Sequence, residues 1–277
     1  IIVMDPNTGD VLAMASYPSF DCNAYAQVSD QSLLVNPAVS SVYEPGSAFK
    51  VVTVAAALQS GIVPPDWTYF DEGRLDIGTE PVLNWDRRAY GLTNLTGVLV
   101  NSLNVGTATI ALEMGWESFY SMLDEFGMGQ LTQIDLQGES EGIMRVPGDS
   151  TWSESDLARN SFGQAISLTP LQMLTAVNAI ANDGVMMRPR VVYQMIEDGI
   201  VTDLPTSPLR TPISAATADL VTAMMVEAVE AGHADEARRL LPEQPDLVLL
   251  DWMLPGRSGL ELAAQLKQSA KTRMMPI

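Results

Sequence analysis

The segment from residue 47 to residue 60, SAFKVVTVAAALQS, predicts a helix that is apolar on nearly every side. Pro45 and Gly46 are expected to form a turn before it, and Gly61 is placed to end it. Such a helix has to be buried, because no face of it is suited to water. The chain must therefore fold into a domain large enough to cover this helix with other elements on all sides.

One charged residue, Lys50, lies within this apolar helix. The chain has only three lysines, and the other two, Lys267 and Lys271, are close to its end. Unlike arginine, a buried lysine can lose its proton and act as a base. Ser47 lies three positions earlier, on the same helix face. The pair predicts a serine nucleophile activated by a lysine amine within hydrogen-bond reach. The alternative is a capping serine followed by a surface lysine.

Composition narrows the function classes. The 277 residues are 47 % hydrophobic, which is typical of a globular protein with one large or two smaller domains. Acidic residues outnumber basic ones by 34 to 15, and the resulting net charge of −19 argues against nucleic acid or an anionic membrane as a partner. A single cysteine, Cys22, excludes an intrachain disulfide, and a single histidine, His233, disfavours a zinc site. We expect neither a metal nor a cofactor.

Local patterns predict further elements along the chain. They are a β-hairpin over residues 1–16, a polar excursion over 64–90, an apolar helix from 95 to 115, an amphipathic helix over 116–126, a helix over 170–183, an edge hairpin over 188–201 and a helix over 214–230. No segment reaches the length of a transmembrane helix. The chain begins within a predicted strand and without an initiator methionine, so we expect a fragment whose membrane anchor lies upstream.

Two polar residues, Ser102 and Asn104, interrupt the second apolar helix. Either one alone is explained as a polar group that helps helices to pack. About fifty residues upstream, however, Ser47 and Lys50 form the pattern Ser-x-x-Lys. Ser-x-x-Lys followed by Ser-x-Asn is the serine acyl-enzyme signature shared by penicillin-binding proteins and class A β-lactamases. We therefore expect Ser102 to lie close to both Ser47 and Lys50.

Residues 1–228 resemble the transpeptidase domain of class B penicillin-binding proteins. The resemblance rests on motifs in the order and spacing of that family: DPNTGDVLAMASYPSFD, YEPGSAFK, LTGVLVNSLNVG, FGMG, SFGQAISLTPLQM and NDGVMMRPR. It implies a mixed α/β architecture, the α+β penicillin-binding and β-lactamase-like fold, truncated at both ends. It also implies a domain outside the cytoplasmic membrane that cross-links peptidoglycan stem peptides and is acylated by β-lactams.

The resemblance assigns a role to each residue of the two motifs. Ser47 would be the nucleophile and Lys50 its base. Ser102 would relay the proton toward the leaving amine, and Asn104 would hydrogen-bond the substrate amide. A β-lactamase is disfavoured, because no Glu motif is placed to activate a deacylating water.

The sequence departs from the family at several positions. Ala48 stands where the family has Thr or Val, Pro37 where Arg is common, and Ala165 where Gly is usual. More seriously, the third family motif, Lys-Thr-Gly or Lys-Ser-Gly, does not occur. Its cation holds the substrate carboxylate, and a backbone N–H beyond it completes the oxyanion hole. The nearest substitutes are Lys-Thr-Arg at 271–273 and Arg-Ser-Gly at 257–259. We therefore expect an impaired enzyme.

Residues 229–277 resemble the middle of a response-regulator receiver domain. In that reading Asp251 is the phospho-accepting aspartate after a buried strand at 247–250, within a partial flavodoxin-like fragment. The receiver's Mg²⁺-binding acidic pair and its later Thr and Lys have no counterparts in the chain. The receiver resemblance covers nearly every residue from 229 onward, whereas the Arg-Ser-Gly reading covers three.

The two resemblances together predict a chimera joined near residues 225–232. A transpeptidase works outside the membrane and a receiver in the cytoplasm, so a misassembled gene or a recombination product is expected rather than an evolved fusion. The alternatives to an acyl-serine enzyme are a phosphorelay receiver and an inactive chimeric product.

Overall fold

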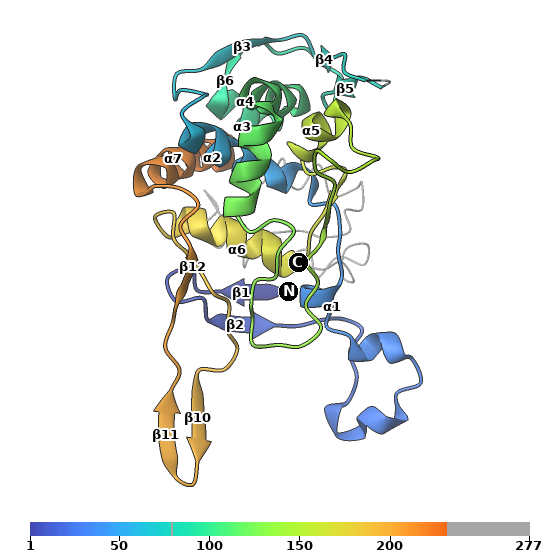
Figure 1. Cartoon of the computed structure of the whole chain (residues 1–277), viewed down its shortest axis with the longest axis vertical. Helices are drawn as coiled ribbons and strands as arrows, with labels where there is room; N and C mark the ends of the chain where they lie inside the picture. The colour runs from blue at the N-terminus through green and yellow to red at the C-terminus, as the bar shows by residue number, and fades with distance from the viewer. Residues whose placement is uncertain (79, 232–277) are drawn as a thin grey trace.

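The computed structural model describes residues 1–78 and 80–231, and the cartoon of Figure 1 follows them from blue to orange. The helices are α1 (Pro37–Ser40), α2 (Lys50–Ser60), α3 (Leu95–Val100), α4 (Asn104–Glu125), α5 (Glu154–Asn160), α6 (Pro170–Ala181) and α7 (Ala215–Ala231), with 3-10 turns η1 (Cys22–Gln27), η2 (Gln31–Leu34) and η3 (Gly46–Phe49). The strands are β1 (Ile2–Met4), β2 (Val11–Met14), β3 (Thr68–Asp71), β4 (Arg74–Leu75), β5 (Val82–Leu83), β6 (Gly91–Asn94), β7 (Ile143–Met144), β8 (Ile166–Ser167), β9 (Met186–Met187), β10 (Gln194–Glu197), β11 (Ile200–Asp203) and β12 (Pro208–Arg210).

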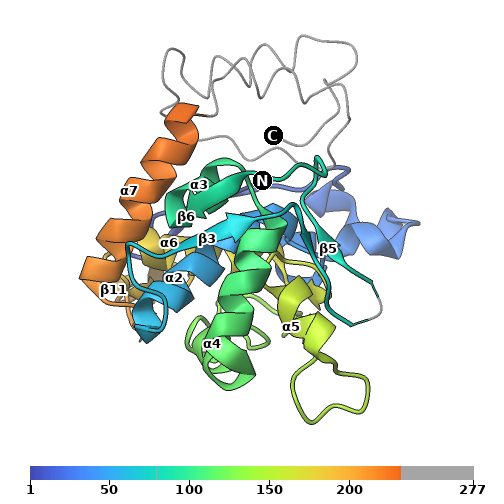
Figure 2. The same ribbon diagram turned by 90° about the horizontal axis from the view of Figure 1, so that it is seen from above.

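Helix α2 lies at the centre of the molecule, as its apolar sequence predicted. It packs against α3, α4, α6 and α7, so that other helices cover it on several sides (Figures 1 and 2). Phe49 and Val52 are completely buried, and the alanines at 55–57 allow close approach of the neighbouring helices. Gly61 ends the helix in the left-handed conformation, with φ +70°. This core helix carries the lysine that the sequence singled out.

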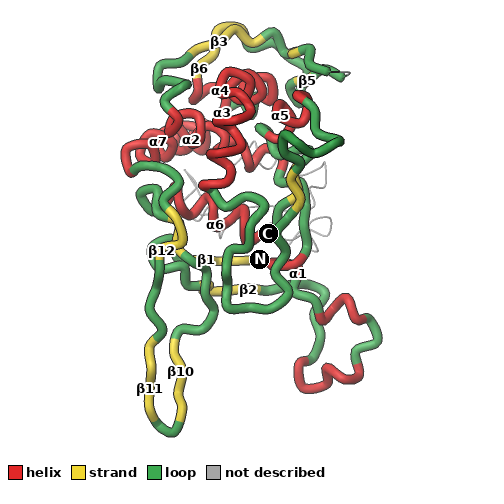
Figure 3. The backbone as a smooth tube through the Cα atoms, in the orientation of Figure 1, coloured by secondary structure: helices red, strands yellow, loops and turns green. Residues whose placement is uncertain are grey.

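The strands are short and form antiparallel pairs around the helical body (Figure 3). The pairs are β1–β2, β3–β6, β4–β5, β7–β8, β9–β12 and β10–β11. Together with the helices they confirm the predicted mixed α/β class. Strands β3 to β6 lie in the excursion between α2 and α3, and in Figure 1 they lie above α4.

Both predicted hairpins are confirmed. β1 pairs with β2, and the turn between them requires glycine: a Cβ on Gly9, whose φ is +80°, would lie 2.3 Å from the carbonyl oxygen of Arg188. β10 pairs with β11 through Asp198 and Gly199, both with positive φ, as in the two-residue turn that suits a hairpin. This second hairpin extends away from the helical body in Figure 1.

The prediction of one continuous helix from residue 95 to 115 is wrong. The segment divides into α3 and α4, separated by a turn at residues 101–103. The break is a Schellman motif. The Leu103 amide donates to the Val98 carbonyl at 2.9 Å, and the Ser102 amide donates to the Leu99 carbonyl at 3.1 Å. The predicted stop at Gly115 is confirmed: its φ of +72° and ψ of 158° lie outside the helical range, and a second helical stretch, included in α4, follows it to Glu125.

The predicted receiver fragment, with Asp251 and the strand at 247–250, lies outside the described residues and stays a prediction. No helix within residues 1–78 and 80–231 is both long and apolar enough to cross a bilayer.

Candidate active site

Ser47 is exposed and lies in the 3-10 turn η3, which leads directly into α2. Two glycines fix the backbone that leads to Ser47. The Gly46 amide donates to the Gly163 carbonyl at 3.0 Å, and a Cβ on Gly163 would lie 2.3 Å from the Gly46 carbonyl oxygen. Only a residue without a side chain fits at position 163. The loop containing Gly163 therefore holds the backbone immediately before Ser47.

Lys50 is buried one turn after Ser47, with 2 % of its surface exposed. Its Nζ donates to the carbonyl oxygen of Ser102 at 2.5 Å and to the hydroxyl of Ser102 at 2.9 Å. The predicted proximity of Lys50 and Ser102 is thereby confirmed. Burial lowers the pKa of Lys50 to about 7, because the apolar surroundings disfavour the charged form. Near neutral pH, Lys50 is therefore a neutral amine in a substantial fraction of the molecules.

Ser47 and Lys50 do not share a hydrogen bond among those found between described residues, where the Lys50 amine is directed to Ser102. The two residues nevertheless lie one turn apart in one helical segment, because the Lys50 backbone amide donates to the Ser47 carbonyl. Catalytic hydrogen bonds are often long or poorly aligned before substrate is bound. Ser47 is exposed to an incoming reactant, whereas Lys50 is buried in the core.

Ser102 has an unusual backbone conformation for a serine. Its φ is +51°, which places it in the left-handed region at the end of α3, where glycine or asparagine is common. A non-glycine residue in this conformation costs roughly 1–2 kcal/mol. Such strain persists only where the surrounding structure compels it, and it is concentrated at functional sites. The conformation turns the Ser102 carbonyl and hydroxyl oxygens together toward Lys50.

Asn104 is the first residue of α4 and is half-buried. Its side-chain amide donates to the carbonyl of Leu83 at 2.9 Å. Its amide oxygen accepts no hydrogen bond among those of the described residues. Because the predicted helix is broken at 101–103, Ser102 and Asn104 do not lie on one helix; the first ends α3 and the second begins α4.

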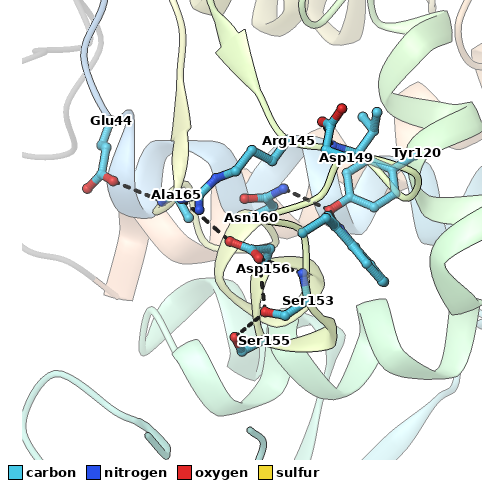
Figure 4. Close-up of polar contacts among 11 residues, drawn as sticks. Glu44, Tyr120, Arg145, Asp149, Ser153, Ser155, Asp156, Asn160 and Ala165 are labelled. Carbon is cyan, nitrogen blue, oxygen red and sulfur yellow. Dashed lines mark hydrogen bonds and ion pairs between the residues drawn. The ribbon is translucent and has the colours of Figure 1, made fainter. Parts of the chain in front are cut away.

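A loop at residues 160–165 is tied to the segment before Ser47, and Figure 4 shows the Glu44 side chain directed toward Ala165. The Ala165 amide donates to Glu44 at 2.9 Å, and Thr53 of α2 donates to the Ser161 carbonyl at 2.8 Å. Ala165 has φ +57°, so alanine occupies a left-handed position for which glycine is better suited. Sequence reasoning assigned no role to Glu44, although it stands three residues before Ser47 in the same motif.

The side chain of Asn160 holds the loop at residues 160–165 in place. When its amide oxygen accepts from the Tyr120 hydroxyl at 3.0 Å, its nitrogen lies 3.0 Å from the Gln164 carbonyl and 3.2 Å from that of Ala165. The Trp152 indole donates to the same Tyr120 hydroxyl at 2.9 Å. The residues after α5 are thus tied to α4 through side chains that the sequence did not single out.

A family comparison decides where this chain belongs. The family described as the penicillin binding protein transpeptidase domain matches residues 1–246. The chain belongs to the penicillin-binding protein transpeptidase family. The match extends past the boundary predicted at residue 228, and that boundary itself stays a prediction.

Curated relatives agree with this assignment. Penicillin-binding protein PbpB of Mycolicibacterium smegmatis is 40 % identical over 204 residues, which are 73 % of this chain and 31 % of the relative. Stage V sporulation protein D of Bacillus subtilis is 35 % identical over 197 residues, which are 71 % of this chain and 30 % of the relative. The chain thus spans about a third of the length of these relatives.

Solved structures share the fold. Penicillin-binding protein 3 of Mycobacterium tuberculosis, complexed with aztreonam, has a TM-score of 0.73 at 39 % identity and covers 82 % of this chain and 51 % of its own. The D,D-transpeptidase domain of a peptidoglycan glycosyltransferase from Eggerthella lenta has a TM-score of 0.76 at 29 % identity, covering 83 % and 60 % respectively. The mixed α/β fold of the described residues is therefore that of penicillin-binding transpeptidases.

Proposed function

We propose that this chain is a D,D-transpeptidase-like serine acyl-transferase. In this proposal Ser47 attacks the carbonyl of a D,D-peptide bond in a peptidoglycan stem peptide, or the carbonyl of a β-lactam. The observation that carries the proposal is the buried Lys50 amine, with its pKa lowered to about 7 and its two hydrogen bonds to Ser102. The names of the relatives support it, because they include peptidoglycan D,D-transpeptidases.

The hydrogen bonds of Lys50 suit it to the role of general base. A neutral amine has two N–H bonds and one lone pair. Its two donors are directed to the carbonyl and hydroxyl oxygens of Ser102. The lone pair is then free to accept the proton of the Ser47 hydroxyl as the serine oxygen bonds to the substrate carbonyl.

Collapse of the tetrahedral intermediate completes the first half of the reaction. The bond between the carbonyl carbon and the leaving amine breaks, and this amine receives the proton from Lys50 through the hydroxyl of Ser102. Ser47 is left as an acyl ester. The amine of a second stem peptide then attacks the ester carbonyl and gives up a proton to Lys50; the bond to the Ser47 oxygen breaks, this oxygen takes the proton back from Lys50, and the cross-link is formed. With a β-lactam the leaving amine stays attached, and the acyl-enzyme persists.

Asn104 is proposed to hydrogen-bond the amide of the substrate. The third family motif, with its cation and its oxyanion-hole N–H, does not occur in the 277 residues. Loss of one oxyanion-hole donor typically lowers turnover about 10²–10³-fold. We therefore expect β-lactam acylation of this chain to be far slower than in a relative with the motif, and transpeptidation to be undetectable.

The proposed partners are peptidoglycan stem peptides and β-lactams, and the proposed place of action is the outer side of the cytoplasmic membrane. A fluorescent penicillin tests the proposal directly. Slow covalent labelling, with the adduct located on Ser47 by mass spectrometry and lost in Ser47→Ala, is the expected result. Labelling that survives Ser47→Ala would refute the assignment of the nucleophile. Phosphorylation of Asp251 by acetyl phosphate would instead favour the receiver reading.

A further inference from the structure

The first turn of α4 has no cap from its own neighbourhood. The residue before the helix is Leu103, whose side chain makes no capping hydrogen bond. The first amides of a helix lack partners within the helix, and a buried one has to find a partner elsewhere. This turn follows directly on Ser102 and includes Asn104. Its anchoring therefore determines where the second motif, Ser-x-Asn at residues 102–104, lies.

The missing cap is supplied from a distant part of the chain. The Oδ1 of Asn84, just after β5, accepts a hydrogen bond from the amide of Val105 at 3.2 Å. In return, the side chain of Asn104 donates to the carbonyl of Leu83 at 2.9 Å. Two hydrogen bonds of opposite direction thus join residues 83–84 to residues 104–105. Asn84 is only 1 % exposed, so water does not compete for these groups.

Asp71 fixes the orientation of the Asn84 amide. The Nδ2 of Asn84 donates to the Asp71 carboxylate at 2.8 Å and to the Arg88 carbonyl at 3.0 Å. Both partners are acceptors, so the oxygen of Asn84 has to face the other way, toward Val105. Asp71 is completely buried and also accepts from the amides of Gly73 at 3.2 Å and Tyr90 at 3.1 Å.

Apolar packing seals the same contact. Val82 of β5 and Val105 and Ala108 of α4 belong to one buried cluster, with at most 4 % of each side chain exposed. The polar excursion above α4 is therefore attached to the helix both by this cluster and by the hydrogen bonds of Asn84. The strained conformation of Ser102 needs anchors on both sides. The Schellman bonds of α3 supply the first anchor, and residues 83–84 supply the second.

We propose that Asn84, oriented by Asp71, is a positioning residue that holds the second motif against Lys50. Asn84 touches neither the reacting atoms nor Lys50; it acts through the first turn of α4. The effect on acylation rests on the proposed function, whereas the effect on the surroundings of Lys50 does not. The polar excursion thereby gains a specific role in the geometry of the site.

The experiment compares Asn84→Ala with the wild-type 277-residue chain and with Asn36→Ala. Asn36 is a matched control, because its side chain also caps a helix, α1, by accepting from a backbone amide at 3.1 Å. Acylation by a fluorescent penicillin is resolved into a binding constant and a rate constant. We expect Asn84→Ala to lower the rate constant at least tenfold, since small misplacements of catalytic groups have effects of this size. Asn36→Ala should leave the rate constant unchanged.

A second readout does not depend on acylation. With only three lysines in the chain, the NMR signal of Lys50 is readily assigned, and its titration gives the pKa directly. Displacement of the Ser102 turn admits water to the Lys50 amine. We therefore expect the pKa of Lys50 to rise in Asn84→Ala and to stay unchanged in Asn36→Ala.

Two substitutions of Asp71 should lower the acylation rate constant to different extents. Asp71→Asn keeps one oxygen that can accept from Asn84 but replaces the other buried acceptor with a donor, so its rate should lie between that of wild type and that of Asp71→Ala, which should resemble Asn84→Ala. If wild type is never acylated but the Lys50 titration shifts in Asn84→Ala, the proposed function fails and the positioning role stands. If Asn84→Ala keeps the wild-type Lys50 titration, or is acylated at the wild-type rate, the positioning role is wrong.

Discussion

Replacement of Ser102 separates the two contributions of this residue, its hydroxyl group and its strained backbone. Ser102→Ala removes the hydroxyl that accepts from Lys50 at 2.9 Å and keeps a side chain at φ +51°. Ser102→Gly removes the same hydroxyl and also relieves the strain. Both variants retain the carbonyl that accepts from Lys50 at 2.5 Å. Any difference between them therefore measures the backbone alone.

The expected magnitudes follow from these contacts. Left-handed strain costs a non-glycine residue roughly 1–2 kcal/mol, and the greater freedom of glycine in the unfolded chain offsets about 0.4–1 kcal/mol of it. Ser102→Gly should thus be about 0.5–1 kcal/mol more stable than Ser102→Ala. Loss of the hydrogen bond should destabilise both by about 1 kcal/mol. In a chain of this size, 1 kcal/mol corresponds to about 2–4 °C in Tm.

Urea and thermal unfolding measure the difference, and penicillin labelling measures the function. We expect both variants to be acylated far more slowly than wild type and to the same extent, although their stabilities differ. Ser121, exposed within α4, is the matched control. There the order should reverse, with glycine about 1 kcal/mol less stable than alanine. If Ser102→Gly is no more stable than Ser102→Ala, the backbone of Ser102 is not strained. If either variant is labelled at the wild-type rate, the Ser102 hydroxyl does not relay the proton.

Three further predictions concern the same region. Ala165→Gly relieves a second left-handed residue while keeping the amide that donates to Glu44, and it should raise the free energy of unfolding by about 0.5–1 kcal/mol in urea titrations. Gly163→Ala forces a Cβ to within 2.3 Å of the Gly46 carbonyl oxygen and should cost about 1–3 kcal/mol, with slower labelling; unchanged stability would contradict the packing. The folded-state pKa of Lys50, about 7, lies below its usual value of 10.5, so the unfolded chain binds more protons between these values. Stability should therefore rise with pH from about 7 to 10.5, labelling should speed up as pH rises through about 7, and Lys50→Met should remove both trends.

Much of the framework follows from local sequence patterns. The all-apolar helix at 47–60, the turn residues of the two hairpins and the proline and glycine that bound α6 act over a few residues, and the structure confirms each of them. The prominence of Lys50 is also a property of the sequence, because an isolated lysine in an apolar helix requires burial and a partner. Its partner, Ser102, was found through the spacing of two family motifs.

The tertiary structure alone decided how the second motif is built. The pattern at 95–115 has the period of a continuous helix, and nothing local marks Ser102 as the point where it breaks. The break depends on contacts between residues far apart in the chain: Lys50 with Ser102, Asn84 with Val105, and Asp71 with Asn84. Helical periodicity reports only which residues share a face. A buried amine and a buried asparagine that need partners can override it, because leaving such groups without hydrogen bonds costs more than one interrupted helix.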